Sequence, residues 1–235
     1  MLAPEDNAIA CEKLLACKKA LFIGAHPDDI EFRAGGLVYL MRQRGVEVTF
    51  AVATRGGKGW VWPFRNVLEW LRERHQRNAA KIMGGAEVLF LGYPDGRLPE
   101  NIDFLRDDLR SLMQSRQPDV VLCWDPKHSQ NPHRDHLAAA LATQAACSRT
   151  QTLEQAQTSV RCTKCWYGSR EPNVWVGFDE ETMRVKIRAL KAHRTETPWF
   201  YFDLRLKKRM IAAMRQEGSE IGSDYAETFR LTHNS

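Results

Sequence analysis

The sequence lacks the features that place a chain in a membrane or send it across one. No apolar run in its 235 residues approaches the roughly 18 residues that a membrane-spanning helix requires. The N-terminus has no continuous apolar stretch of the kind found in secretory signals, because Glu5, Asp6 and Glu12 interrupt it. We therefore expect a cytoplasmic protein.

A strong charge of either sign is also missing. The chain has 34 lysine and arginine residues against 29 aspartate and glutamate residues, a formal net charge of +5. The densest basic stretch, 205–209, belongs to a helical pattern with apolar positions at Leu204, Met210 and Met214. This pattern indicates a solvated helix face, with a membrane surface or an acidic partner as the alternative. We expect no nucleic-acid partner.

A second cysteine pair is absent too. Cys162 and Cys165 form a lone C-x-x-C motif, and a structural zinc site would need a further pair. We interpret them as reduced thiols in a loop, with a redox or disulfide role as the alternative. The segment that contains them, 149–172, is expected to be a variable loop.

The sequence does contain an alternation of apolar strands and helical patterns. The predicted strands cover residues 19–25, 46–53, 86–91, 119–124 and 173–178. The predicted helices cover residues 5–17, 35–44, 66–84, 101–116, 134–148, 180–193 and 203–217. The first strand is apolar without alternation, which is typical of parallel strands covered on both faces. Because no linker interrupts the pattern, we predict one α/β domain over 1–235, with an N-terminal helix within 1–17.

Two polar motifs follow predicted strands. His26-Pro27-Asp28-Asp29 comes directly after the first strand, and Asn131-Pro132-His133-Arg134-Asp135-His136 follows the strand over 119–124. The carboxyl ends of parallel strands meet at one edge of a sheet, where ligands bind. Together the motifs can supply two imidazoles and one carboxylate to a catalytic metal and leave a carboxylate to accept a proton. The pattern favours hydrolysis.

Each motif has an ordinary structural explanation when taken alone. Adjacent aspartates often form a turn or cap a helix, and a His-x-x-His pair often lies on a solvated helix face. In a loop over a strand end, Asp29 could reach the metal while Asp28 faces the water. The functional interpretation rests on both motifs following strands of one sheet.

Further motifs accompany these two in order along the chain. They are Gly35-Gly36, Thr54-Arg55-Gly56, Leu91-Gly92-Tyr93-Pro94-Asp95-Gly96, Lys186-x-x-Ala189-x-x-x-His193 and Tyr225-Ala226-Glu227-x-Phe229. The whole set resembles the PIG-L/LmbE family of zinc-dependent de-N-acetylases over roughly residues 18 to 229. The resemblance implies a Rossmann-like three-layer α/β sandwich with a mostly parallel central sheet.

The resemblance also implies catalytic roles. His26, Asp29 and His136 would be the metal ligands, with zinc as the expected ion and Fe2+ or Co2+ as alternatives. Asp28 would be the general base. His133 would be an imidazolium that stabilises the oxyanion.

Four residues are expected on the substrate side. Arg72 matches an arginine in the family's Arg-x-x-Glu helix, although His75 stands where the family has glutamate. Asp95 resembles a pocket residue for a sugar hydroxyl or the leaving amine, with a turn role as the alternative. Trp60 and Trp62 follow the glycine loop after the second strand, where aromatic faces suit sugar rings. A lid on a neighbouring subunit or a core role is the alternative for both.

Other departures from the family pattern concern the surroundings of the metal. Gly57 stands where many members have an acidic residue, and Arg134 replaces a proline. Asn131 occupies a position where some members place a tyrosine, so no tyrosine is assigned to the oxyanion.

The predicted function is zinc-dependent removal of the N-acetyl group from an N-acetylglucosamine-containing small molecule or glycoconjugate. One alternative is a zinc amidohydrolase of the same fold that acts on a non-sugar amide. Another is a non-catalytic sugar- or nucleotide-binding module, which for nucleotides would need a G-x-G-x-x-G fingerprint that the segment 24–29 lacks. No sequence pattern identifies the aglycone of the substrate. A homo-oligomer is an alternative to a monomer.

Overall fold

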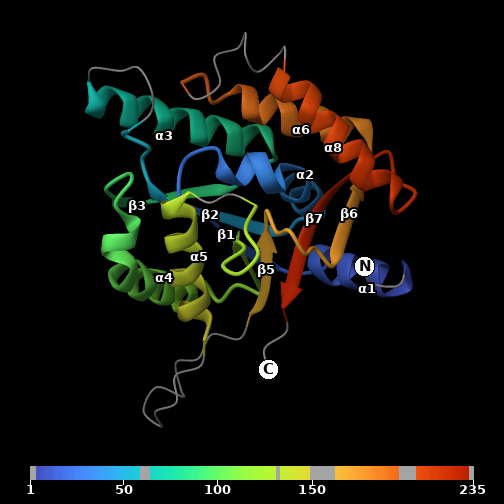
Figure 1. Cartoon of the computed structure of the whole chain (residues 1–235), viewed down its shortest axis with the longest axis horizontal. Coiled ribbons are helices and arrows are strands. Elements are labelled where there is room, and N and C mark those ends of the chain that lie inside the picture. Colours follow the sequence, from blue (N-terminus) through green and yellow to red (C-terminus); the bar gives the residue numbers. More distant parts are fainter. Residues whose placement is uncertain (1–3, 59–63, 131–132, 149–161, 196–204, 233–235) are drawn as a thin grey trace.

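The computed structural model describes residues 4–58, 64–130, 133–148, 162–195 and 205–232. Its middle layer is a seven-stranded sheet in the order β3-β2-β1-β4-β5-β7-β6 (Figure 1). The strands are β1 (Lys19–Gly24), β2 (Glu47–Thr54), β3 (Glu87–Tyr93), β4 (Val120–Trp124), β5 (Thr163–Tyr167), β6 (Val174–Phe178) and β7 (Tyr225–Thr232). Neighbours from β3 to β5 pair in parallel, whereas β7 is antiparallel to β5 and β6.

Helices cover both faces of this sheet (Figure 1). One face carries α2 (Asp29–Gln43), α3 (Arg65–Ile82), α6 (Glu180–Lys191) and α8 (Lys207–Ser219). The other carries α1 (Pro4–Leu15), α4 (Ile102–Arg116) and α5 (Arg134–Cys147), with a 3-10 helix over Leu98–Asn101 before α4. The predicted three-layer α/β sandwich is confirmed. Within the described ranges, no helix is long and apolar enough to span a bilayer.

The strands β1 and β4 lie side by side at the centre of the sheet and carry the two polar motifs at their ends. Phe22 pairs with Leu122 across them, and neither side chain is exposed. From β1 the chain continues outward through β2 to β3, and from β4 it continues the other way to β5. The carboxyl ends of β1 and β4 therefore form the switch point where such sheets bind ligands.

Two of the strands were not expected as strands. β5 lies inside the segment 149–172, so the prediction of a loop is wrong for Thr163–Tyr167. Cys165 is buried in this strand, and the Sγ of Cys162 lies 3.8 Å from the Sγ of Cys147 at the end of α5. All of these are thiols. β7 contains the motif at 225–229, whose antiparallel pairing no local pattern had indicated.

Helix α2 begins at Asp29, earlier than the predicted start at Gly35, and it kinks at Ala34, where φ is −137°. Beyond the kink, the N–H groups of Gly36 and Leu37 donate to the carboxylate of Glu227 at 2.8 and 2.9 Å. A Cβ atom on Gly36 would lie 2.8 Å from a ring carbon of Phe178. The glycine pair thus permits close packing at a kink rather than marking a helix start.

Candidate active site

A pocket of about 400 Å³ opens at the carboxyl ends of β1 and β4. Every predicted site residue that the structure describes lines it: His26, Asp28, Asp29, Arg72, Asp95, His133 and His136. Phe32, Lys58, Gly96 and Trp124 complete the lining. Trp60 and Trp62 lie outside the described residues.

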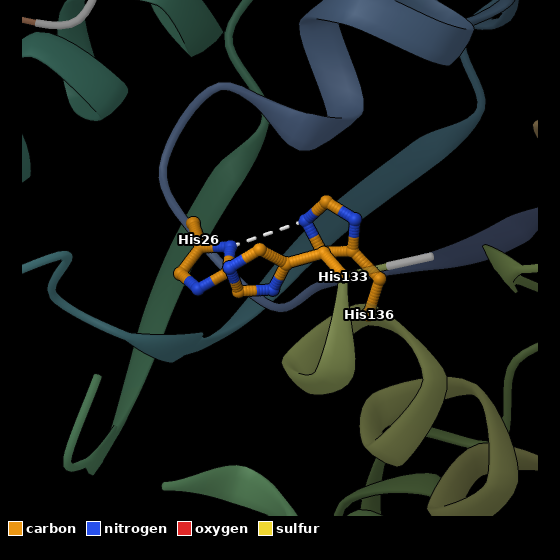
Figure 2. A group of neighbouring side chains, drawn as sticks. All are labelled: His26, His133 and His136. Carbon is orange, nitrogen blue, oxygen red and sulfur yellow. Dashed lines mark hydrogen bonds between the residues drawn. The ribbon is translucent and has the colours of Figure 1, made fainter. Parts of the chain in front are cut away.

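The two motifs reach the pocket from different elements. His26 lies in the loop after β1, and Asp29 is the first residue of α2. His136 lies in the first turn of α5, and its ring stacks on Trp124 of β4 with centroids 4.2 Å apart. Figure 2 shows the rings of His26, His133 and His136 gathered where these segments meet.

The donor atoms of the predicted metal ligands converge. His26 Nδ1 lies 3.2 Å from His136 Nε2, the contact dashed in Figure 2. Asp29 Oδ1 lies 3.1 Å from His136 Nε2, and Asp29 Oδ2 lies 4.0 Å from His26 Nδ1. Ligand atoms arranged tetrahedrally at zinc bond lengths are about 3.4 Å apart, so this donor set fits one zinc ion. His133 also lies close enough to His26 and His136 to complete a three-histidine group.

The other ring nitrogen of His26 faces two carboxylates. His26 Nε2 lies 3.1 Å from Asp95 Oδ1 and 3.3 Å from Asp135 Oδ2. Burial opposes protonation of His26, but hydrogen bonds and charges from Asp135, Asp95 and Asp29 raise its pKa to about 10. A carboxylate on the far nitrogen of a ligating histidine fixes the ring orientation and strengthens it as a ligand. Asp95 and Asp135 are placed to do this for His26.

His133 caps the N-terminus of α5. Its Nδ1 accepts the N–H of Asp135 at 3.3 Å, which an imidazolium could not do because both of its nitrogens carry protons. Partial burial, together with the charges of His26 and His136, lowers the pKa of His133. This arrangement suits a neutral imidazole with its proton on Nε2, and the imidazolium role of His133 stays a prediction.

Arg72 and Asp95, predicted to contact substrate, also organise the loops of the pocket. Arg72 donates to the carbonyl of Gly56 at 2.7 Å and to that of Pro27 at 3.3 Å. Gly56 has a φ of +68°, and a Cβ atom there would overlap the Arg72 guanidinium. The second oxygen of Asp95 accepts the N–H of Lys58 at 2.8 Å.

Two residues that support the site were not predicted from the sequence. Asp135 is fully buried and accepts the N–H groups of Gly96 and Leu98 at 2.6 and 3.2 Å, besides facing His26. The position of Asp135 between the two histidines of the motif was the sequence signal that could have identified it. Gln76, one helical turn after Arg72, accepts the N–H of Asp28 at 3.1 Å. Its spacing places it on the same helix face as Arg72, but no local pattern predicts the contact with Asp28.

Comparisons with known proteins identify the family of this chain. The family model for PIG-L, GlcNAc-PI de-N-acetylase, matches residues 21–147. A Bacillus cereus protein named "Probable N-acetyl-alpha-D-glucosaminyl L-malate deacetylase 2" is 30% identical over 190 residues, which cover 77% of this chain and 84% of that protein. Diacetylchitobiose deacetylase of Thermococcus kodakarensis is 25% identical over 224 residues, which cover 91% and 83% of the two chains.

A solved structure shows the same fold. N,N'-diacetylchitobiose deacetylase from Pyrococcus horikoshii superimposes with a TM-score of 0.83 at 23% identity, covering 99% of this chain and 93% of that one. The family model covers more than half of the chain, and the Bacillus cereus relative matches most of it. The chain therefore belongs to the PIG-L family of deacetylases, hydrolytic enzymes that act on acetamides.

Proposed function

We propose that this protein removes the N-acetyl group from an N-acetylglucosamine-containing small molecule or glycoconjugate, with one zinc ion as cofactor. The observation that carries the proposal is the convergence of donor atoms from His26, Asp29 and His136 in a pocket that Asp28 also lines. N-acetylglucosamine is common to the family description and to the name of the Bacillus cereus relative.

In the proposed reaction, His26, Asp29 and His136 hold the metal. When bound, a divalent ion lowers the pKa of water and polarises the acetamide carbonyl. Asp28 accepts the proton that the attacking water loses. His133 donates its Nε2–H to the carbonyl oxygen as negative charge develops there. Asp28 then returns the proton to the leaving nitrogen, so that water and an acetamide become acetate and a free amine.

The substrate side of the pocket is proposed to include Arg72, Asp95, Trp60 and Trp62. Asp95 and Arg72 line the pocket and also bind its loops. Because Asp95 contacts His26 as well, the shape of the sugar site would be coupled to the orientation of the His26 ring. Lys58, exposed at the rim, adds a cation on the same side. Fe2+ and Co2+ remain alternatives to zinc, since the ligand set alone does not fix metal selectivity.

The test is acetate release by protein stripped with a chelator and reloaded with Zn2+, Co2+ or, without oxygen, Fe2+. Substrates would be N-acetylglucosamine linked to a second sugar, to an inositol and to an organic acid, with an N-acetylated amino acid as the non-sugar amide. We expect equal amounts of acetate and free amine from at least one sugar, dependent on metal. Hydrolysis of the non-sugar amide alone would favour the amidohydrolase, and sugar binding without hydrolysis would favour a binding module.

A further inference from the structure

Asp28 has a backbone conformation that side chains rarely adopt. Its φ is 99° and its ψ −22°, although it precedes helix α2 at a position that is usually extended. Among the described residues, Gln117 is the other non-glycine residue with positive φ, and it ends α4 in an ordinary left-handed cap at φ 50°. Strained conformations persist only where the surroundings hold them, often at functional sites.

Two side chains of α3 hold the peptide group that precedes Asp28. Arg72 Nη2 donates to the carbonyl oxygen of Pro27 at 3.3 Å, and Gln76 Oε1 accepts the N–H of Asp28 at 3.1 Å. This carbonyl and this N–H belong to the same planar peptide unit. Arg72 and Gln76 are four residues apart and thus share one face of the helix. Together they fix the orientation of the Pro27–Asp28 peptide plane. The φ of Asp28 is the rotation about the N–Cα bond that follows this plane.

Gln76 is in turn held in one orientation. Its Nε2 donates to Glu31 Oε1 at 2.5 Å, and a carboxylate can only accept. The amide nitrogen must therefore face Glu31, which leaves the amide oxygen for Asp28. Gln76 is 1% exposed and Glu31 is 0% exposed. The second oxygen of Glu31 lies 3.6 Å from His193 Nε2, so the contacts continue into the buried core.

We propose that Gln76 is a positioning residue that, with Arg72, clamps the Pro27–Asp28 peptide and so holds the Asp28 carboxylate in the pocket. The inference rests on the proposed function, in which Asp28 is the general base. Gln76 is not part of the pocket lining, so its proposed effect on turnover passes through Asp28. Displacing a base that does not bind substrate should lower kcat and leave KM and metal content unchanged.

The test is Gln76→Leu, which removes both hydrogen bonds at nearly constant volume. The matched control is Asn7→Leu: Asn7 is also a buried amide, and it accepts the N–H of Trp175 at 2.8 Å and donates to its carbonyl at 3.1 Å. We expect both variants to melt at lower temperature, but only Gln76→Leu to lose kcat, by about 10- to 10²-fold. Equal kcat in the two variants would overturn the proposal. Gln76→Asn, which shortens the reach of the amide, replaces Gln76→Leu if that variant does not fold.

A double-mutant cycle separates positioning from general damage. In an Asp28→Asn background the base is already gone, so Gln76→Leu should cause no further loss of kcat. The same fold-loss in both backgrounds would contradict action through Asp28.

The crystal structure of Gln76→Leu tests the clamp without any assay of activity. We expect the Pro27–Asp28 peptide to rotate and the φ of Asp28 to leave the left-handed region. An unchanged φ would overturn the clamp. If the wild-type protein releases no acetate, the proposed function fails. The structural result still decides whether Gln76 holds the orientation of the Pro27–Asp28 peptide.

Discussion

Asp28 and Asp29 are adjacent in the chain but lie in different surroundings. Asp29 is 5% exposed, and its Oδ2 accepts the N–H groups of Ala25 and His26 at 2.8 and 3.0 Å. Burial opposes its ionisation, but the charges and hydrogen bonds of His136 and His26 hold the pKa of Asp29 well below its usual range. Asp28 is half-buried and lines the pocket. These surroundings support Asp29 as the ligand and Asp28 as the base of the proposed reaction.

Exchanging either carboxylate for an amide should separate these roles. Asp28→Asn should keep its metal and lose about 10²- to 10⁴-fold in kcat, because an amide cannot accept the proton. Asp29→Asn should lose metal together with activity, because the neutral amide is a weaker ligand. Metal stoichiometry and steady-state kinetics measure both, with Asp103→Asn on the exposed face of α4 as the control. Loss of metal in Asp28→Asn instead would exchange the two assignments.

Three elements far apart in the sequence meet at the carboxylate of Glu227. This β7 residue accepts the freed N–H groups of Gly36 and Leu37 in α2 and lies 2.5 Å from Nζ of Lys186 in α6. Both charged side chains are 3% exposed. A buried pair of this kind is costly to break from one side, because the remaining charge has no compensation.

Lys186→Met should therefore lower the free energy of unfolding by about 3–5 kcal/mol. Arg184→Met is the control on the same helix, since its ion pair with Glu180 is solvent-exposed at 2.9 Å and should matter little. Urea denaturation compares the two. Similar unfolding free energies would show that Glu227 is satisfied by the α2 backbone alone.

The stability of the folded chain should also depend on pH through Glu217 of α8. This side chain borders a second cavity of about 220 Å³, together with Arg33, Lys186 and Glu227. Burial raises the pKa of Glu217 to about 7. The positive charge of Lys186 lowers this pKa, and the negative charge of Glu227 raises it further. Its ordinary value is 4.5, so between these two pH values the folded chain binds the proton that the unfolded chain releases. Stability should fall as pH rises through this window.

Glu217→Gln removes the ionisation and keeps the shape of the side chain. We expect it to raise the melting temperature above pH 7 and to change it little near pH 4.5, where the native side chain is already protonated. Melting curves at several pH values test this, with Glu220→Gln, exposed after the end of α8, as the control. A change in melting temperature of the same size at all pH values would show that ionisation of Glu217 does not cause the pH dependence.

Local patterns were sufficient for the central strands and for the two motifs of the candidate metal site. The apolar runs of β1 and β4 are continuous because parallel strands are covered on both faces, so their positions can be seen without the fold. The histidines and aspartates of the two motifs are unusual directly after such strands, and a shared sheet edge predicts their meeting. Their roles as ligands, base and oxyanion donor stay predictions.

The remaining features depend on contacts between distant segments, which no local pattern specifies. β5 and β7 become strands through pairing with β4 and β6, and Cys162 meets Cys147 instead of its motif partner. The pairing of Asp95 and Asp135 with His26 joins segments that lie far apart in the chain. The hold of Gln76 on Asp28 depends on how α3 packs beside the loop after β1. The sequence determined which chemical groups stand at the sheet edge, and tertiary packing decided their orientations, because hydrogen-bond geometry is set only when both partners are in place.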